Sequence, residues 1–378
     1  MANIFDYLSW RGDLSFSAAS FNPVDNIILS QLSYLPLDGI VPGPGEKNKI
    51  SIAAAAKAFA ERQHRPELRQ TVIFREDPDL LRLLGSSKRF RNCKLFAYVN
   101  NIDVTQEKQF SALSIITGDK TCFVAYRGTD ATFIGWKEDF NMSYSDVIPA
   151  QIDAVKYLEK IARHFEGPLR IGGHSKGGNL AVYAAANCKK TTRSRISAIY
   201  SNDAPGFHRH IIESEGFMAI RERISSYVPQ SSIVGMLLEH GNDYSVVKSS
   251  GAGLVQHILY FWEVTHNNVV KVDTITRQSR FVDKTLQEWI NNLDYEQRQQ
   301  YIDALFSILN ASQAKSIHEF TADWFNAAGR MIKSLGKIDK STRKLIRETL
   351  FALFRSAGKN METLLKPESA AEGKNIHL

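Results

Sequence analysis

The segment from 169 to 187 constrains the fold more than any other part of the chain. It begins as a short apolar run, continues as Gly173-His174-Ser175-Lys176-Gly177 and ends in an alanine-rich stretch with helical spacing. A serine in the pattern G-x-S-x-G between a strand and a helix lies in a strained turn, where a side chain at either flanking glycine would collide with neighbouring backbone. The segment therefore predicts a strand, a tight turn that presents Ser175, and a helix.

Strands and helices alternate around this turn. Strands that alternate with helices favour right-handed crossovers and a largely parallel sheet with helices on both faces. Two β-branched segments upstream flank a Gly-Asp turn and predict a hairpin. The predicted strands are 110–116, 121–126, 169–172, 196–201, 223–228 and 244–248, and the predicted helices are 26–34, 51–63, 150–165 and 177–187.

The strand pattern ends near residue 282. Beyond it, four segments begin at Asp or Ser caps and carry apolar residues at three- and four-residue spacing, which predicts helices. We therefore expect one domain over 1–282, a helical appendage over 283–365 and a flexible tail over 366–378. The appendage is expected to pack on the first domain, to cover its site, or to bind a partner.

Composition excludes several classes of protein. The chain has 378 residues, of which 43% are apolar and 23% charged, the balance of a soluble globular protein. No apolar run reaches the roughly 18 residues that a membrane-spanning helix needs. Charged residues near the N-terminus, Asp6, Arg11 and Asp13, argue against a Sec signal peptide. We expect a cytoplasmic location, with export by a route that needs no Sec signal left open.

Cysteine spacing and net charge narrow the chemistry further. Cys93, Cys122 and Cys188 are widely spaced and form no C-x-x-C pair, so we expect neither a metal site nor a disulfide framework, and no cofactor. The net charge of +7 is a modest excess without dense basic blocks, which argues against a nucleic-acid partner. An anionic membrane surface would suit this charge equally well.

Ser175 is the predicted nucleophile. A serine hydroxyl needs a neighbouring imidazole to take its proton, and the imidazole needs a carboxylate that fixes its tautomer. After a turn of this kind the acid and then the histidine follow the serine in chain order. His257, just beyond the last predicted strand, fits best, and His240 is its main rival. The histidines that satisfy the order are His208, His210, His240, His257 and His266.

Asp203 is the favoured acid. It directly follows the strand 196–201 and so lies at the sheet edge where Ser175 is expected. The turn after the next strand, V-P-Q-S-S-I-V-G, offers no carboxylate, and Asp243 precedes its strand instead of following one. The oxyanion donors expected are the amide of Lys176 and the amide and hydroxyl of Thr129, in the loop Y-R-G-T-D.

These segments resemble known lipases. Phe123 to Phe140, F-V-A-Y-R-G-T-D-A-T-F-I-G-W-K-E-D-F, together with G-H-S-K-G-G resembles the lipase family typified by fungal triacylglycerol lipases. More closely, W-R-G-D-L-S-F, V-D-N-I-I-L-S-Q-L-S-Y-L, S-N-D-A-P-G-F, V-P-Q-S-S-I-V-G-M-L-L and Q-H-I-L-Y-F-W-E-V look like a largely uncharacterised bacterial family of lipase-like α/β hydrolases, over about residues 2–285. The resemblance implies an α/β-hydrolase fold and an esterase or lipase triad of Ser175, Asp203 and His257.

One departure concerns the acid. Fungal-type lipases carry it after the following strand, at a place where this chain has Ser232-Ile233-Val234-Gly235. An acid one strand earlier corresponds to the pancreatic-lipase arrangement, and this leaves Asp203 as the candidate. Of the three predicted residues, the acid is therefore the one whose assignment depends most on the structure.

The function expected is that of a serine carboxylester hydrolase with an acyl-enzyme intermediate, a lipase or phospholipase ahead of an esterase for small soluble esters. Apolar residues between 228 and 261 suit either an acyl chain or core packing. Basic residues after the turn suit phosphate head groups, namely Lys176, Lys189, Lys190, Arg193 and Arg195. Two alternatives stay open: a non-enzymatic scaffold whose helical part recruits a partner or membrane, and a thioesterase or peptidase. No motif indicates the oligomeric state.

Overall fold

The computed structural model describes residues 1–276 apart from 63–71, 104, 131–136, 140, 143–144, 233 and 252, and beyond 276 only residue 296. The predicted domain boundary near 282, the helical appendage over 283–365 and the tail lie outside the described residues. These predictions therefore stay predictions.

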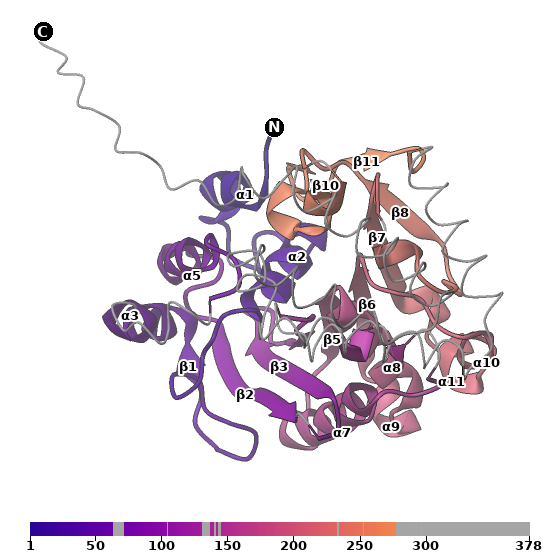
Figure 1. Ribbon diagram of the computed structural model, residues 1–378. Coiled ribbons are helices and arrows are strands. Elements are labelled where there is room, and N and C mark those ends of the chain that lie inside the picture. The colour runs from indigo at the N-terminus through magenta and orange to yellow at the C-terminus, as the bar shows by residue number, and fades with distance from the viewer. Residues whose placement is uncertain are drawn as a thin grey trace, which may run out of the picture.

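A twisted sheet forms the centre of the molecule (Figure 1). Within the described residues it has nine strands, in the order β1-β2-β3-β4-β5-β6-β7-β8-β11. Strands β4 to β8 pair in parallel, whereas β1 to β4 and β8 with β11 pair antiparallel. The strands are β1 (Ile50–Ser51), β2 (Lys94–Asp103), β3 (Lys108–Ile116), β4 (Cys122–Tyr126), β5 (Leu169–His174), β6 (Ile196–Asn202), β7 (Ile224–Pro229), β8 (Tyr244–Val247) and β11 (Lys271–Val272). A separate pair joins β9 (Val264–Thr265) to β10 (Asn268–Val269).

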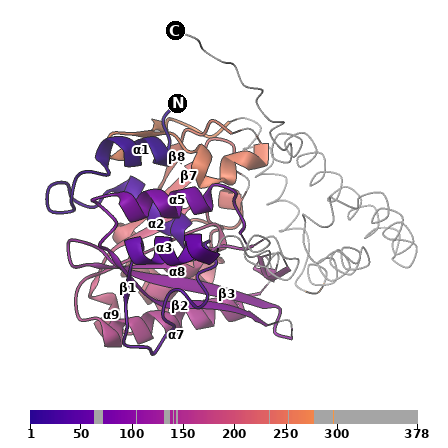
Figure 2. The same ribbon diagram turned by 90° about the vertical axis from the view of Figure 1, so that its left-hand side faces the viewer.

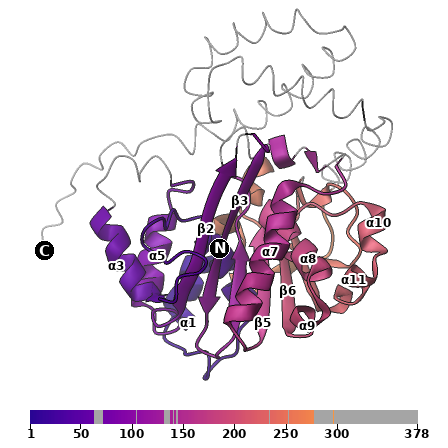
Figure 3. The same ribbon diagram turned by 90° about the horizontal axis from the view of Figure 1, so that it is seen from below.

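Helices cover both faces of the sheet. On one face α2 (Pro23–Leu32) packs on β4 and β5, with α1 (Ile4–Arg11), α3 (Ile52–Arg62) and α5 (Asp77–Ser86) beside it (Figure 2). On the other face lie α7 (Pro149–His164) and α8 (Lys176–Asn187), with the short helices α9 (Lys190–Arg193), α10 (Arg209–Ile212) and α11 (Glu215–Met218) (Figure 3). Each helix layer buries its own apolar cluster against the sheet. The architecture is the expected α/β-hydrolase fold.

The predicted elements match the structure closely where local signals are strong. The hairpin is β3 and β4, and the four later strands are β5 to β8, each within two residues of its predicted bounds. Ser51 Oγ accepts a hydrogen bond from the Ala54 amide at 3.2 Å, so it caps α3 as expected. Helix α2 begins three residues before its predicted start because Asn22 caps it by accepting from the amides of Val24 and Asp25.

Arg89, which lies between α5 and β2, forms a buried ion pair with Asp25. Arg89 donates to both carboxylate oxygens of Asp25, at 2.8 and 2.5 Å, and neither side chain is exposed. The same guanidinium donates to main-chain carbonyls of residues 14, 15, 19 and 20. Arg89 therefore holds the N-terminal loop W-R-G-D-L-S-F and the residues after it against α2.

In the part of the chain that the structure describes, no helix is long and apolar enough to cross a bilayer.

Candidate active site

Ser175 occupies a strained turn between β5 and α8. Its backbone has φ 58° and ψ −136°, and the residue is 8% exposed. A Cβ on Gly173 would lie 2.3 Å from the Gly177 carbonyl, and one on Gly177 would lie 2.1 Å from the Tyr126 carbonyl oxygen. Both positions therefore require glycine, as the sequence predicts. The predicted strand, turn and helix are present.

Helix α8 directs its positive end toward this turn. Lys176 is the first residue of α8, so its amide is among the four that have no acceptor within the helix. Partial positive charge collects at such an end and favours an anion there. The Lys176 amide is thus placed beside Ser175 as an oxyanion donor would need to be.

Asp203 and His257 form a short hydrogen bond. Asp203 follows β6, is fully buried, and accepts from His257 Nδ1 at 2.6 Å through Oδ2. Its other oxygen, Oδ1, accepts from Ser232 Oγ at 2.5 Å and from the Gly235 amide at 3.1 Å. Because Nδ1 of His257 donates, the neutral ring keeps its lone pair on Nε2, which is the tautomer of a general base.

The other candidate histidines have different partners. His240 donates to the Gly235 carbonyl and His208 to the Met142 carbonyl. His210 lies 3.9 Å from Asp146, and His266 Nδ1 lies 3.2 Å from the Thr265 hydroxyl. Asp243, the weaker acid candidate, is exposed. Among these candidates the structure brings together His257 and Asp203.

His174, the residue before Ser175, contacts His257 directly. Its Nε2 donates to the His257 carbonyl at 2.7 Å, and the two ring centroids are 4.3 Å apart. The Tyr34 hydroxyl donates to Nδ1 of His174 at 2.8 Å, so both ring nitrogens are used. Burial, and then the nearby His257, hold the pKa of His174 well below its usual value, so the ring stays neutral. No motif in the sequence predicts this contact.

The segment that carries His257 is anchored in the core. The Trp262 indole donates to the Gln256 carbonyl at 2.9 Å, and the Tyr260 hydroxyl donates to Asp77 Oδ1 at 2.7 Å. Gln31 donates to the same Asp77 oxygen at 2.7 Å. Burial raises the pKa of Asp77 to about 7. Tyr260 and Trp262 are therefore buried in the core. Of the two roles expected for the apolar residues between 228 and 261, Tyr260 has the packing role.

The loop with Thr129 lies against Ser175. A Cβ on Gly128 would lie 3.0 Å from Ser175 Cβ and 2.6 Å from the His174 carbonyl oxygen. The Thr129 hydroxyl donates to Asp139 Oδ2 at 2.5 Å, so it is already engaged, and of the two Thr129 groups that were expected to donate, the amide is the one left to meet an oxyanion. Burial raises the pKa of Asp139 to about 6. Trp136, in the same lipase-like segment, lies outside the described residues.

The side chain of Lys176 is buried beside this loop. Its Nζ lies 2.8 Å from Glu138 Oε2 and 3.6 Å from Asp139 Oδ1. Two of the other basic residues, Arg193 and Arg195, lie beyond the far end of α8 and donate to main-chain carbonyls there. These two arginines are therefore not placed to meet a head group at Ser175.

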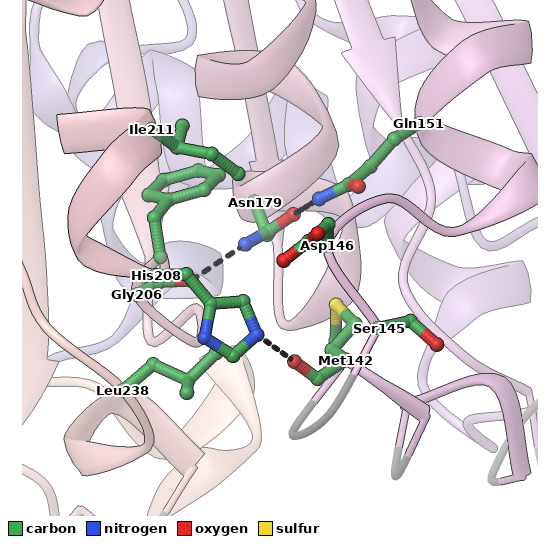
Figure 4. A pocket seen from close by; sticks show the side chains of 10 residues that line it. Met142, Ser145, Asp146, Gln151, Asn179, Gly206, His208, Ile211 and Leu238 are labelled. Atoms are coloured by element: carbon green, nitrogen blue, oxygen red, sulfur yellow. Dashed lines mark hydrogen bonds between the residues drawn. The ribbon is translucent and has the colours of Figure 1, made fainter. Parts of the chain in front are cut away.

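A hollow lies beside α8 (Figure 4). Around it, Gln151 donates to Asn179 Oδ1 at 2.8 Å, and Asn179 donates to the Gly206 carbonyl at 2.8 Å. Its apolar lining comes from Met142, Phe207, Ile211 and Leu238.

In the described part of the chain, no group of three or more His, Cys, Asp or Glu side chains is arranged to hold a metal ion.

The family model of the Mbeg1-like proteins matches residues 84–307, more than half of the chain. The chain belongs to the Mbeg1-like family. The match spans Thr129, Ser175, Asp203 and His257, so the Mbeg1-like region contains the whole of the candidate site. A comparison with curated proteins found no match.

Three solved lipases resemble this Mbeg1-like chain in structure. M37 lipase is 16% identical with a TM-score of 0.35, and the match covers 56% of this chain and 69% of that one. The Rhizomucor miehei lipase in its propeptide complex is 14% identical with a TM-score of 0.33, covering 50% and 65%. The extracellular lipase LipA from Serratia marcescens is 11% identical with a TM-score of 0.32, covering 58% and 40%. Likenesses this distant carry no argument. The fold is assigned from the strand order and from the strand-turn-helix at Ser175.

Proposed function

We propose that this chain is a serine carboxylester hydrolase that acts on lipid esters through an acyl-enzyme intermediate. The observation that carries the proposal is the 2.6 Å hydrogen bond from His257 Nδ1 to the buried Asp203, in a chain whose Ser175 occupies a strained strand-to-helix turn. An acid that fixes the imidazole tautomer has its main use beside a nucleophile that must lose a proton.

In the proposed reaction, Ser175 Oγ attacks the ester carbonyl while His257 Nε2 takes the hydroxyl proton. The carboxylate of Asp203 stabilises the imidazolium that forms. The amides of Lys176 and Thr129 donate to the oxyanion, and the N-terminus of α8 adds to this stabilisation. His257 then gives the proton to the departing alcohol, and a water molecule, deprotonated by the same imidazole, hydrolyses the acyl-enzyme and releases the acid and free Ser175.

The preference for a lipid ester has its support in apolar side chains close to the site. Val234, Leu237 and Leu238 stay partly exposed near Gly235, and Ile258 stays partly exposed next to His257. Partly exposed apolar side chains at this place suit an acyl chain, because contact with the chain removes their surface from water. An anionic membrane, which would present such esters, is the proposed partner surface.

The test combines turnover with labelling of the serine. Wild type, Ser175→Ala and Ser194→Ala are assayed on p-nitrophenyl esters from acetate to palmitate and treated with a fluorophosphonate probe. Ser194 is exposed and serves as the matched control. We expect activity and labelling in wild type and Ser194→Ala, neither in Ser175→Ala, and a preference for the longer esters. A folded wild type that neither hydrolyses these esters or phospholipid vesicles nor binds the probe would overturn the proposal in favour of a scaffold.

A further inference from the structure

The side chain of Lys176 lies at the centre of a buried group of charges that the proposed reaction does not use. Its Nζ is 2.8 Å from Glu138 Oε2 and 3.6 Å from Asp139 Oδ1, and it donates to the Gln109 carbonyl at 3.2 Å. Lys176 is 1% exposed and Glu138 is fully buried. Burying such ions costs several kcal/mol each, and pairing offsets this cost only where the geometry is good. The presence of this buried group therefore needs an explanation.

One arm of this group reaches the predicted oxyanion donor. Asp139 uses Oδ2 to accept from the Thr129 hydroxyl, while its Oδ1 faces the Lys176 ammonium. The ammonium favours the ionised form of Asp139, and the ionised carboxylate is the stronger acceptor for the hydroxyl. Lys176 thereby strengthens the bond that holds Thr129.

A second arm reaches the next residue of the same loop. Gln109 Oε1 accepts from the Asp130 amide at 3.1 Å. The Gln109 main chain is held from both sides, since its carbonyl accepts from Lys176 Nζ and its amide donates to Glu138 Oε2 at 3.0 Å. The loop is thus tied at two successive residues to groups that Lys176 contacts.

We propose that the Lys176 side chain is a positioning residue that fixes the Thr129 loop against the first turn of α8, so that the amides of Thr129 and Lys176 face one oxyanion. This inference rests on the proposed hydrolysis. The same residue would then contribute one donor through its backbone and align the other through its side chain.

Lys176→Met tests this because methionine keeps the backbone amide and an unbranched apolar stem, and removes the ammonium group with its charge and its hydrogen bonds. We expect kcat to fall by about 10- to 100-fold, less than the 10²- to 10³-fold for complete loss of an oxyanion donor, with KM within about twofold. An alkyl boronic acid forms a serine adduct that places a negative oxygen in the oxyanion hole. Its inhibition constant should rise by the same factor by which kcat/KM falls. Lys156→Met is the matched control, since the Lys156 side chain is 73% exposed.

A second variant separates positioning from stability. Lys176→Met leaves Glu138 as a buried carboxylate with only neutral donors, so the double variant Lys176→Met/Glu138→Gln removes both charges together. We expect its thermal stability to return toward wild type while kcat and boronate affinity stay low. Recovery of activity together with stability, or a folded Lys176→Met with wild-type kcat, would overturn the proposal. An inactive wild type would instead refute the hydrolase function itself, and Ser175→Ala measured alongside distinguishes the two failures.

Discussion

Replacing Asp203 by asparagine would reverse the tautomer of His257. In the wild type, Ser232 Oγ and the Gly235 amide donate to Oδ1, and His257 Nδ1 donates to Oδ2. Asparagine has one acceptor oxygen and one NH₂ donor. An NH₂ in the Oδ1 place would face the Gly235 N–H, so the oxygen takes that place and the NH₂ faces His257. Nδ1 must then accept, the ring proton moves to Nε2, and the ring cannot take a proton from Ser175.

The size of the effect follows from this tautomer. A triad histidine held in the wrong tautomer costs about 10⁴-fold in kcat, which at 1.36 kcal/mol for each factor of ten is about 5 kcal/mol of transition-state stabilisation. The fold should survive, because Asp203 has a positive φ of 46° and asparagine tolerates that conformation as aspartate does. Stability should therefore change by no more than about 2 kcal/mol.

The assay measures kcat on the best p-nitrophenyl ester together with the thermal unfolding of each variant. Asp243→Asn is the matched control, because Asp243 is exposed and precedes β8. We expect the control to keep wild-type kcat. A folded Asp203→Asn that retains more than about a tenth of wild-type kcat would refute the reasoning and show that another group orients His257.

Two further predictions concern buried polar groups near the His257 segment. Burial raises the pKa of Asp77 from 3.8 to about 7, so the folded chain keeps a proton that the unfolded chain releases, and stability is lost as pH rises from about 4 to 7. In urea unfolding, Asp77→Asn should therefore raise the free energy of unfolding by at most about 4 kcal/mol near pH 8 and by little near pH 4. Asp79→Asn is the control and should leave it unchanged, because Asp79 is exposed. Equal effects of Asp77→Asn at both pH values would contradict this. Tyr34→Phe leaves Nδ1 of His174 without the Tyr34 hydroxyl and should cost about 1–3 kcal/mol of stability in the same assay, with kcat lower by about tenfold and KM unchanged; a wild-type kcat would show that the contact does not position His257.

The elements that could be predicted are those whose signal is local. The turn at Ser175 follows from two glycines that have no room for a Cβ, and β5 to β8 follow from short apolar runs between turns. Strand β2 was not predicted, because its second half contains Asn100, Asn101 and Asp103 and is mostly exposed. It pairs with β3 over this half nonetheless, so pairing to a buried neighbour outweighs its composition.

Chain order and strand position predicted that Asp203 and His257 lie together, because parallel strands place their carboxyl ends at one edge, and the two side chains form a hydrogen bond. The groups around them could not be predicted in this way. Tyr34 reaches His174 across 140 residues of chain, and Lys176 reaches Glu138 across 38, and neither spacing follows any motif. Such contacts depend on how helices and loops pack over the sheet, which no local pattern specifies.

The loop after β7 holds Asp203, which follows β6, in its orientation. The resemblance to fungal lipases places a carboxylate after β7, where this chain has Ser232 and Gly235 instead. Both donate to Asp203 Oδ1, and a Cβ on Gly235 would lie 2.3 Å from that oxygen, so only glycine lets its amide come within 3.1 Å. With Oδ1 held by two donors, Oδ2 is left to accept from His257. The loop that lacks a carboxylate thus orients Asp203, which the neighbouring strand supplies.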